Sequence, residues 1–161
     1  MAVDVIVDAP VWNGTDIEGL SNTAFSGVMA LMNVAPDAYE AAVLACNDAR
    51  IAALNADFRG KPQPTNVLSW PSEDRATPGK TPPVPDPSEL GDIAIAFETC
   101  QREATAQNKS FEAHVTHLLV HGMLHLLGYD HESEQDAALM EAREVEILAK
   151  MGIADPYRDA G

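Results

Sequence analysis

The sequence predicts a single α/β domain built from four short strands and about five helices. Its 161 residues are a typical length for one domain, and 46% of them are apolar, which is enough to fill a core. Short apolar runs alternate along the chain with longer segments of helical periodicity that have capping residues at their ends. Strands and helices in this arrangement pack as layers, so we expect residues 1–161 to share one core.

The first two predicted elements are a strand over residues 3–7 and a helix over residues 16–33. The strand is apolar and rich in β-branched residues. Thr15 and Glu18 have the spacing of a capping box, which indicates a helix start near residue 16. Pro36 lies just beyond the predicted end of the helix.

A second strand over residues 39–45, a short helix over 48–57 and a third strand over 66–70 follow. Either residue of the Asn-Asp pair at the start of this helix can cap it. Residues 59–65 contain a glycine and two prolines, so they cannot be helical. We expect the inner face of the short helix to carry Ile51, Leu54 and Phe58.

Residues 72–89 form a Pro-rich loop. Five prolines between positions 78 and 87 forbid a helix and keep the backbone extended. Such a loop is inert by default, although a mobile flap is the alternative. A fourth strand over residues 91–97 and a short helix over 98–107 come next.

Two longer helices complete the fold. The first, over residues 110–127, is capped by Ser110, and apolar residues cover most of its circumference, so we expect it to be buried. The second, over residues 133–151, starts at a capping box and ends at a glycine. We expect its inner face to carry Ala138, Ala142, Val145 and Leu148, and its solvated outer face to carry Glu141, Glu144 and Glu146.

All five histidines fall in one short stretch, and three of them have the spacing of metal ligands. His121 and His125 share one helix face, and Gly128 can end the helix at positive φ, so that His131 returns as the third ligand. Three imidazoles with an open fourth position are typical of catalytic zinc, whereas a structural site closes with a fourth ligand such as cysteine. We therefore predict one Zn²⁺ per chain, in a cleft along the helix over residues 110–127.

The two remaining histidines, His114 and His117, are expected in the lining of the cleft. His117 lies on the same helix face as the ligands, but each turn advances about 5.4 Å, so three successive turns cannot aim at one small ion. Asp130 and Glu132 are candidates to hydrogen-bond a ligand histidine, and either can equally be a solvated carboxylate.

The histidine block resembles the signature of a known family. Its sequence is HGMLHLLGYDH over residues 121–131, and the segments FRGKPQPTNVLSW (58–70), LGDI (90–93) and GIADPY (152–157) accompany it. Over about residues 40–157 the chain is similar to the YbeY family, bacterial zinc-dependent endoribonucleases of ribosomal RNA maturation. Residues before 38 show no such resemblance.

The resemblance implies a mixed four-stranded sheet and a zinc hydrolase that cleaves single-stranded RNA with a metal-bound water. It implies a role at the 3′ end of small-subunit rRNA and in ribosome quality control, with rRNA and the small ribosomal subunit and its proteins as partners. Arg59 lies in a matching block, and its guanidinium fork suits the scissile phosphate, although an ordinary surface arginine is the alternative. Lys61 of the same block is expected in the substrate cleft.

A zinc peptidase is the main alternative function. The three histidines and Gly128 have the spacing of zinc proteases with a His-Glu-x-x-His motif, but Gly122 occupies the position of their catalytic glutamate. The chain thus has the ligands of such a peptidase without its general base. A third hypothesis, a non-enzymatic ribosome-assembly factor with structural zinc, is opposed by the open fourth ligand position.

The net charge of −15 disfavours broad electrostatic binding of RNA. Residues 50–80 carry a net charge of +2, from five cations and three carboxylates, although this can also be a chance fluctuation. Cys46 and Cys100 have no motif spacing, so we expect free thiols in the cytoplasm. No apolar run approaches the roughly 18 residues of a membrane span, so we predict no membrane association, and the oligomeric state stays open.

Overall fold

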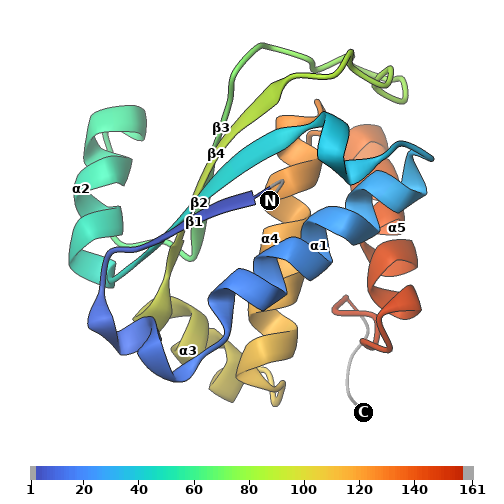
Figure 1. Cartoon of the computed structure of the whole chain (residues 1–161). Coiled ribbons are helices and arrows are strands. Elements are labelled where there is room, and N and C mark those ends of the chain that lie inside the picture. Colours follow the sequence, from blue (N-terminus) through green and yellow to red (C-terminus); the bar gives the residue numbers. More distant parts are fainter. Residues whose placement is uncertain (1–2, 158–161) are drawn as a thin grey trace.

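The four predicted strands form one mixed sheet in the order β1-β2-β4-β3 (Figure 1). The computed structural model describes residues 3–157; residues 1–2 and 158–161, which the predicted domain includes, lie outside the described part. β1 and β4 pair with β2 in parallel, and β3 pairs with β4 in antiparallel orientation, which confirms the mixed sheet. The strands span Val3–Val7 (β1), Glu40–Cys46 (β2), Val67–Pro71 (β3) and Glu89–Ala96 (β4).

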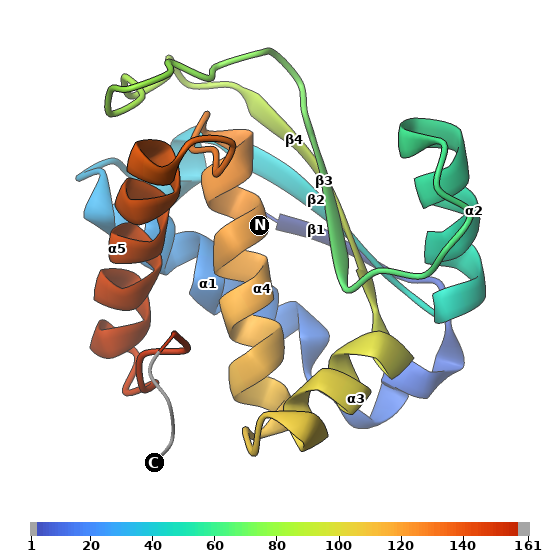
Figure 2. The same cartoon turned by 180° about the vertical axis from the view of Figure 1, so that it is seen from behind.

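Within residues 3–157, five α-helices surround the sheet, as predicted. They span Ile17–Leu31 (α1), Asp48–Arg59 (α2), Phe97–Ala106 (α3), Phe111–Leu126 (α4) and Glu134–Lys150 (α5). α1, α4 and α5 lie on one side of the sheet and α2 on the other, as Figure 1 shows and Figure 2 repeats from behind. Two short 3-10 helices, Pro10–Gly14 and Pro36–Ala38, add to the predicted set. None of the described helices combines the length and the apolar character needed to cross a membrane.

The sheet separates two apolar cores. On β4, Ile93 belongs to the main core with α1 and α4, whereas Ala94 belongs to a smaller core under α2, because successive strand residues point to opposite faces. α2 closes the smaller core through Ile51. Phe58, which was predicted on the inner face of this helix, is instead 52% exposed. The arrangement buries α4, as its apolar sequence predicted.

The observed ends of the elements differ slightly from the predicted ones, and local hydrogen bonding explains the shifts. The N-cap of α1 is Asp16 in place of Thr15, since the Asp16 carboxylate accepts a hydrogen bond from a first-turn N–H. α2 continues to Arg59, beyond its predicted end at 57, until Gly60 takes a left-handed conformation with φ of 69°. β4 begins at Glu89, two residues earlier than predicted, because its ladder with β2 already starts there.

The Pro-rich loop between β3 and β4 is anchored to the end of α4. Arg75 donates from Nη1 to the carbonyl oxygens of Leu126 at 2.9 Å and Leu90 at 3.2 Å. The backbone N–H of Gly79 donates to Asp136 at the start of α5, at 2.9 Å. The Arg75 side chain is only 9% exposed, so this cation of the net-positive stretch holds the fold together and does not face solvent.

Candidate metal centre

α4 carries two of the predicted ligands, His121 and His125, and its C-terminal turn positions the third. The helix ends at Leu126, and Gly128, just after the C-cap Leu127, has a φ of 104° and donates from its N–H to the carbonyl of His125 at 3.0 Å. A Cβ at Gly128 would collide with the backbone of Arg75, so conformation and packing both require glycine there. The chain then turns back and brings His131 to the end of the helix.

The three histidines converge on one point. Their ligand nitrogens all lie within 4.8 Å of one another. The ring centroids of His121 and His125 are 4.8 Å apart, those of His125 and His131 4.9 Å, and those of His121 and His131 5.5 Å. His121 and His125 are half-buried and His131 is exposed, so one side of the cluster faces solvent. This donor set fits a zinc ion with one open position.

The environment keeps His125 neutral. Burial, followed by the neighbouring rings of His121 and His131, lowers the pKa of His125 to about 4. A ligating imidazole must be neutral, so the Nε2 or Nδ1 lone pair of His125 is available at neutral pH.

A buried carboxylate, Glu144 of α5, lies directly behind the cluster. Its side chain is 0% exposed, and it accepts hydrogen bonds from His117 Nε2 at 2.6 Å, His121 Nδ1 at 3.2 Å and the Tyr157 hydroxyl at 2.7 Å. Burial alone would raise the pKa of Glu144, but the hydrogen bonds from His117 and His121 outweigh it and lower the pKa to about 2. An ionised carboxylate only accepts, so His121 carries a proton on Nδ1, which leaves the Nε2 lone pair of the neutral ring available to bind a metal.

The sequence interpretation of Glu144 as a solvated residue was wrong. The buried stripe of α5 includes Met140, Glu144 and Leu148, whereas Ala138 and Ala142, predicted to face inwards, are exposed. Glu144 is four residues from both Met140 and Leu148, so it lies in the apolar stripe of the helix. Its place in the apolar stripe was the signal in the sequence that Glu144 is buried. A glutamate is almost never fully buried unless it is paired, so a buried Glu144 also implies a hydrogen-bonding partner.

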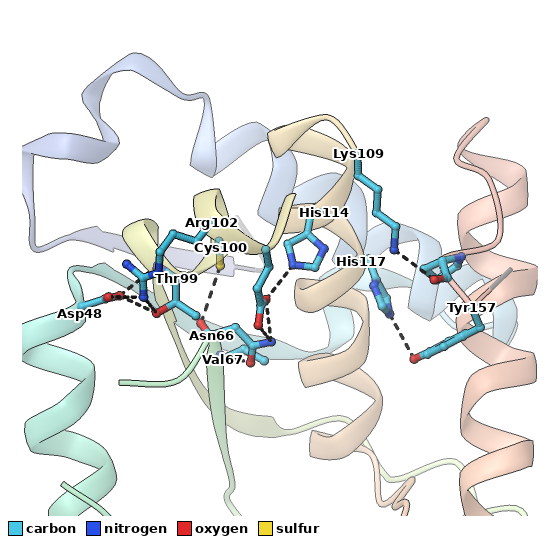
Figure 3. Close-up of polar contacts among 12 residues, drawn as sticks. Asp48, Asn66, Val67, Thr99, Cys100, Arg102, Lys109, His114, His117 and Tyr157 are labelled. Atoms are coloured by element: carbon cyan, nitrogen blue, oxygen red, sulfur yellow. Dashed lines mark hydrogen bonds and ion pairs between the residues drawn. The ribbon is translucent and has the colours of Figure 1, made fainter. Parts of the chain in front are cut away.

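The histidine cluster opens into a cavity of about 420 Å³ beside the edge strand β3. Residues 65–69 line it consecutively, and because alternate strand side chains point to opposite faces, the backbone edge of β3 must border the cavity. Arg59 and His117, both predicted at the cleft, lie in this lining, and Tyr157 joins them (Figure 3 shows His117 and Tyr157 facing each other). Among residues 3–157, no aspartate or glutamate lines the cavity.

Two residues that were predicted in the cleft, His114 and Lys61, are not part of this lining. His114 is buried under α3, where its Nε2 lies 2.9 Å from the Glu103 carboxylate, which also accepts from Asn66 Nδ2 at 3.1 Å (Figure 3). Burial lowers the pKa of His114, and the bond to Glu103 partly offsets this effect. His114 thus joins α4 to α3, because α3 packs over the first turns of α4, and Glu103 links both helices to Asn66, just before β3. Lys61 is exposed in the loop after α2.

Asp130 and Glu132 do not hold a ligand histidine. The Asp130 carboxylate accepts from the backbone N–H of His131 at 2.7 Å, which supports the turn after α4. In the described part of the chain, neither carboxylate is hydrogen-bonded to a histidine ring, and the bond to His121 comes from Glu144 instead.

Gly122 faces the sheet and not the cavity. A Cβ at this position would lie 3.2 Å from Ile93 Cδ1 of β4. A glutamate at position 122 would therefore enter the main core, and the close packing of α4 on β4 leaves no room for a protease-like general base.

A family model described as Endoribonuclease YbeY matches residues 11–152. A protein of Jannaschia sp. (strain CCS1) named Endoribonuclease YbeY is 53% identical over 160 residues, which cover 98% of this chain and 100% of the relative. A Ruegeria pomeroyi protein of the same name is 54% identical over 164 residues, which cover 98% of each chain. The similarity therefore includes the first part of the chain, where the motifs showed no resemblance.

The solution structure of a protein from Thermotoga maritima has a similar fold. It superposes with a TM-score of 0.58 at 21% sequence identity, over 99% of this chain and 98% of that one. At this identity the likeness concerns the fold alone.

Proposed function

Because the chain belongs to the YbeY family of endoribonucleases, we propose that it hydrolyses phosphodiester bonds of single-stranded RNA with a zinc ion held by His121, His125 and His131. The composition of the cavity is the observation that carries the proposal. It joins the three imidazoles to Arg59 and to the backbone edge of β3, and among residues 3–157 no carboxylate lines it. Such a lining admits an anionic phosphodiester, although the whole chain has a net charge of −15.

Three groups of residues have separate roles in the proposed hydrolysis: the metal ligands, Arg59 and Glu144. His121, His125 and His131 would hold the zinc ion, which would supply hydroxide near neutral pH by lowering the pKa of a bound water to about 7. Arg59 is exposed at the cavity, and its guanidinium binds two phosphate oxygens and stabilises the charge that develops on them. Glu144 holds the proton on Nδ1 of His121, and this keeps Nε2 of the same ring available as a ligand.

The substrate and its setting are finer parts of the proposal. We propose that the substrate is rRNA at the 3′ end of the small subunit, that the small ribosomal subunit is the partner, and that the protein works in the cytoplasm. The net charge of −15 predicts weak binding of free RNA, which favours presentation of the strand by a partner. Cys46 and Cys100 are buried free thiols, which is consistent with a reducing compartment.

A zinc peptidase is the second candidate, and one observation favours it. The backbone edge of β3 along the cavity can pair with an extended peptide, as edge strands do in β-augmentation. Gly122 opposes this candidate, because the general base of such peptidases has no counterpart at the cavity.

Cleavage assays on three substrates separate the candidates. We expect the zinc-loaded protein to cut a single-stranded rRNA precursor fragment and to leave the same sequence as a duplex and casein intact. His125→Ala should abolish cleavage, whereas His114→Ala, on the same helix outside the cavity, should retain it in the folded fraction. Chelator-sensitive proteolysis that His125→Ala removes would establish the peptidase. Full zinc binding without cleavage of any substrate would refute both the nuclease and the peptidase hypotheses. The non-enzymatic ribosome-assembly factor would then be the remaining hypothesis.

A further inference from the structure

The exposed aromatic side chains of residues 3–157 gather at the histidine cavity. Phe58 is 52% exposed and Tyr157 is 47% exposed, whereas the other seven aromatic residues are buried or half-buried. Both exposed rings line the cavity that holds the three histidines. Exposure of large rings at one site, and burial of rings elsewhere, points to a ligand with an apolar face.

The Tyr157 ring has a structural contact that explains its position, whereas the exposed face of Phe58 has no such explanation. Tyr157 donates its hydroxyl to Glu144 at 2.7 Å, so its position follows from the network behind the metal centre. Phe58 has no polar side-chain group, and its ring packs against Trp70 at the edge of the smaller core: the two ring centroids lie 5.4 Å apart, at an interplanar angle of 59°. Trp70 thus holds the Phe58 ring in place without covering it.

Phe58 also stands beside the residue proposed to bind phosphate. Phe58 and Arg59 are consecutive in the last turn of α2, and both line the cavity. A nucleotide offers the two groups that this pair can bind. Its flat base can stack on the Phe58 ring, and its adjacent anionic phosphate can pair with the Arg59 guanidinium. Aromatic rings stack on unpaired bases in many proteins that bind single strands, and the arginine takes the backbone.

We propose that Phe58 is a subsite for an unpaired nucleobase, which stacks on its exposed ring while Arg59 binds the adjacent phosphate. The inference rests on the proposed function and explains how the site selects single strands, since a base in a duplex has no free face for the ring. Every base has an aromatic face, so the subsite tolerates different sequences. It also supplies affinity that does not depend on charge, which a chain of net charge −15 needs in order to hold RNA.

Binding of two probes to the metal-free protein tests the subsite. One probe is a short single-stranded oligouridylate, and the other is an abasic ribose–phosphate chain of the same length, which keeps the phosphates and lacks the bases. We expect the parent protein to prefer oligouridylate by about 5- to 150-fold, the range for stacking of one base. Phe58→Leu, which stays apolar against Trp70, should lose most of this preference, and Phe58→Trp should retain it.

Two further measurements make the outcome decisive. Val84→Ala is the matched control, because Val84 is also 52% exposed but lies in the Pro-rich loop away from the cavity, and it should leave the preference unchanged. The preference due to Phe58 should persist at high salt, whereas the contribution of Arg59 should fall. An unchanged preference in Phe58→Leu, at an unchanged melting temperature, would overturn the subsite. Failure of the zinc-loaded parent to cut RNA would instead refute the proposed function, so the two results are distinguishable.

Discussion

Replacing Glu144 with glutamine should weaken zinc binding by about 10- to 100-fold, the usual effect of removing a carboxylate that orients a ligand histidine. Glutamine has the shape of glutamate, but its amide nitrogen is a donor. Three donors, from His117, His121 and Tyr157, converge on the Glu144 carboxylate. The amide must therefore meet at least one of them with its own N–H, and His121 loses the acceptor that keeps its proton on Nδ1.

The same change should also destabilise the fold. Glu144 is 0% exposed, and a buried donor left without an acceptor costs about 1–3 kcal/mol. For a chain of this size the melting temperature should fall by roughly 3–10 °C. The comparison must be made in chelator, because bound zinc adds stability of its own.

Competition with a chromophoric chelator measures the zinc affinity, and the nitrogen chemical shifts of His121 in the metal-free protein report its tautomer. Glu146→Gln is the control, since Glu146 is exposed on the same helix and pairs only with Arg143 among the described residues. Unchanged zinc affinity together with a proton still on Nδ1 of His121 would refute the orienting role. A lower melting temperature at unchanged zinc affinity would make Glu144 a purely structural residue.

Three further predictions concern the metal, the phosphate and the packing of the helices. Alanine at any one of the three ligand histidines should remove bound zinc, measured by metal analysis after dialysis, whereas His114→Ala should keep it; a His131→Ala variant with full zinc would exclude that ligand. Arg59→Ala should lower turnover of RNA by roughly 10²–10³ and Arg59→Lys should recover little, at unchanged zinc content and melting temperature; full cleavage would remove Arg59 from the site. Asp48→Asn should lower the melting temperature at neutral pH. Burial raises the pKa of Asp48, but hydrogen bonds from Arg102 and Thr99 outweigh it and lower the pKa. Its stabilisation is therefore present above the ordinary carboxyl pKa and is lost as the pH falls through the lowered value. Melting curves of the parent and the variant should converge in acid, and a gap that persists there would contradict this assignment.

The sequence alone determined those features that depend on neighbours along the chain. The helix and strand pattern follows from local periodicity and capping, and Ser110 and Ser133 cap α4 and α5 as predicted. The convergence of His121 and His125 with His131 also follows from local geometry, since one helical turn and one glycine turn connect them. The role proposed for Arg59 came from the family resemblance of its segment, and spacing alone would not have indicated it.

Only the tertiary structure decided which side chains from distant segments meet. Glu144 reaches His121 because α5 packs on α4, and helical periodicity shows which residues share a face but not which element that face will meet. In the same way the packing of α3 over the start of α4 turned His114 to Glu103 and away from the cavity. Arg59 lies far from the histidines in sequence, and the sheet between α2 and α4 brings them to one cavity. Burial and charge pairing depend on these contacts, so local pattern could not separate the buried Glu144 from the solvated glutamates beside it.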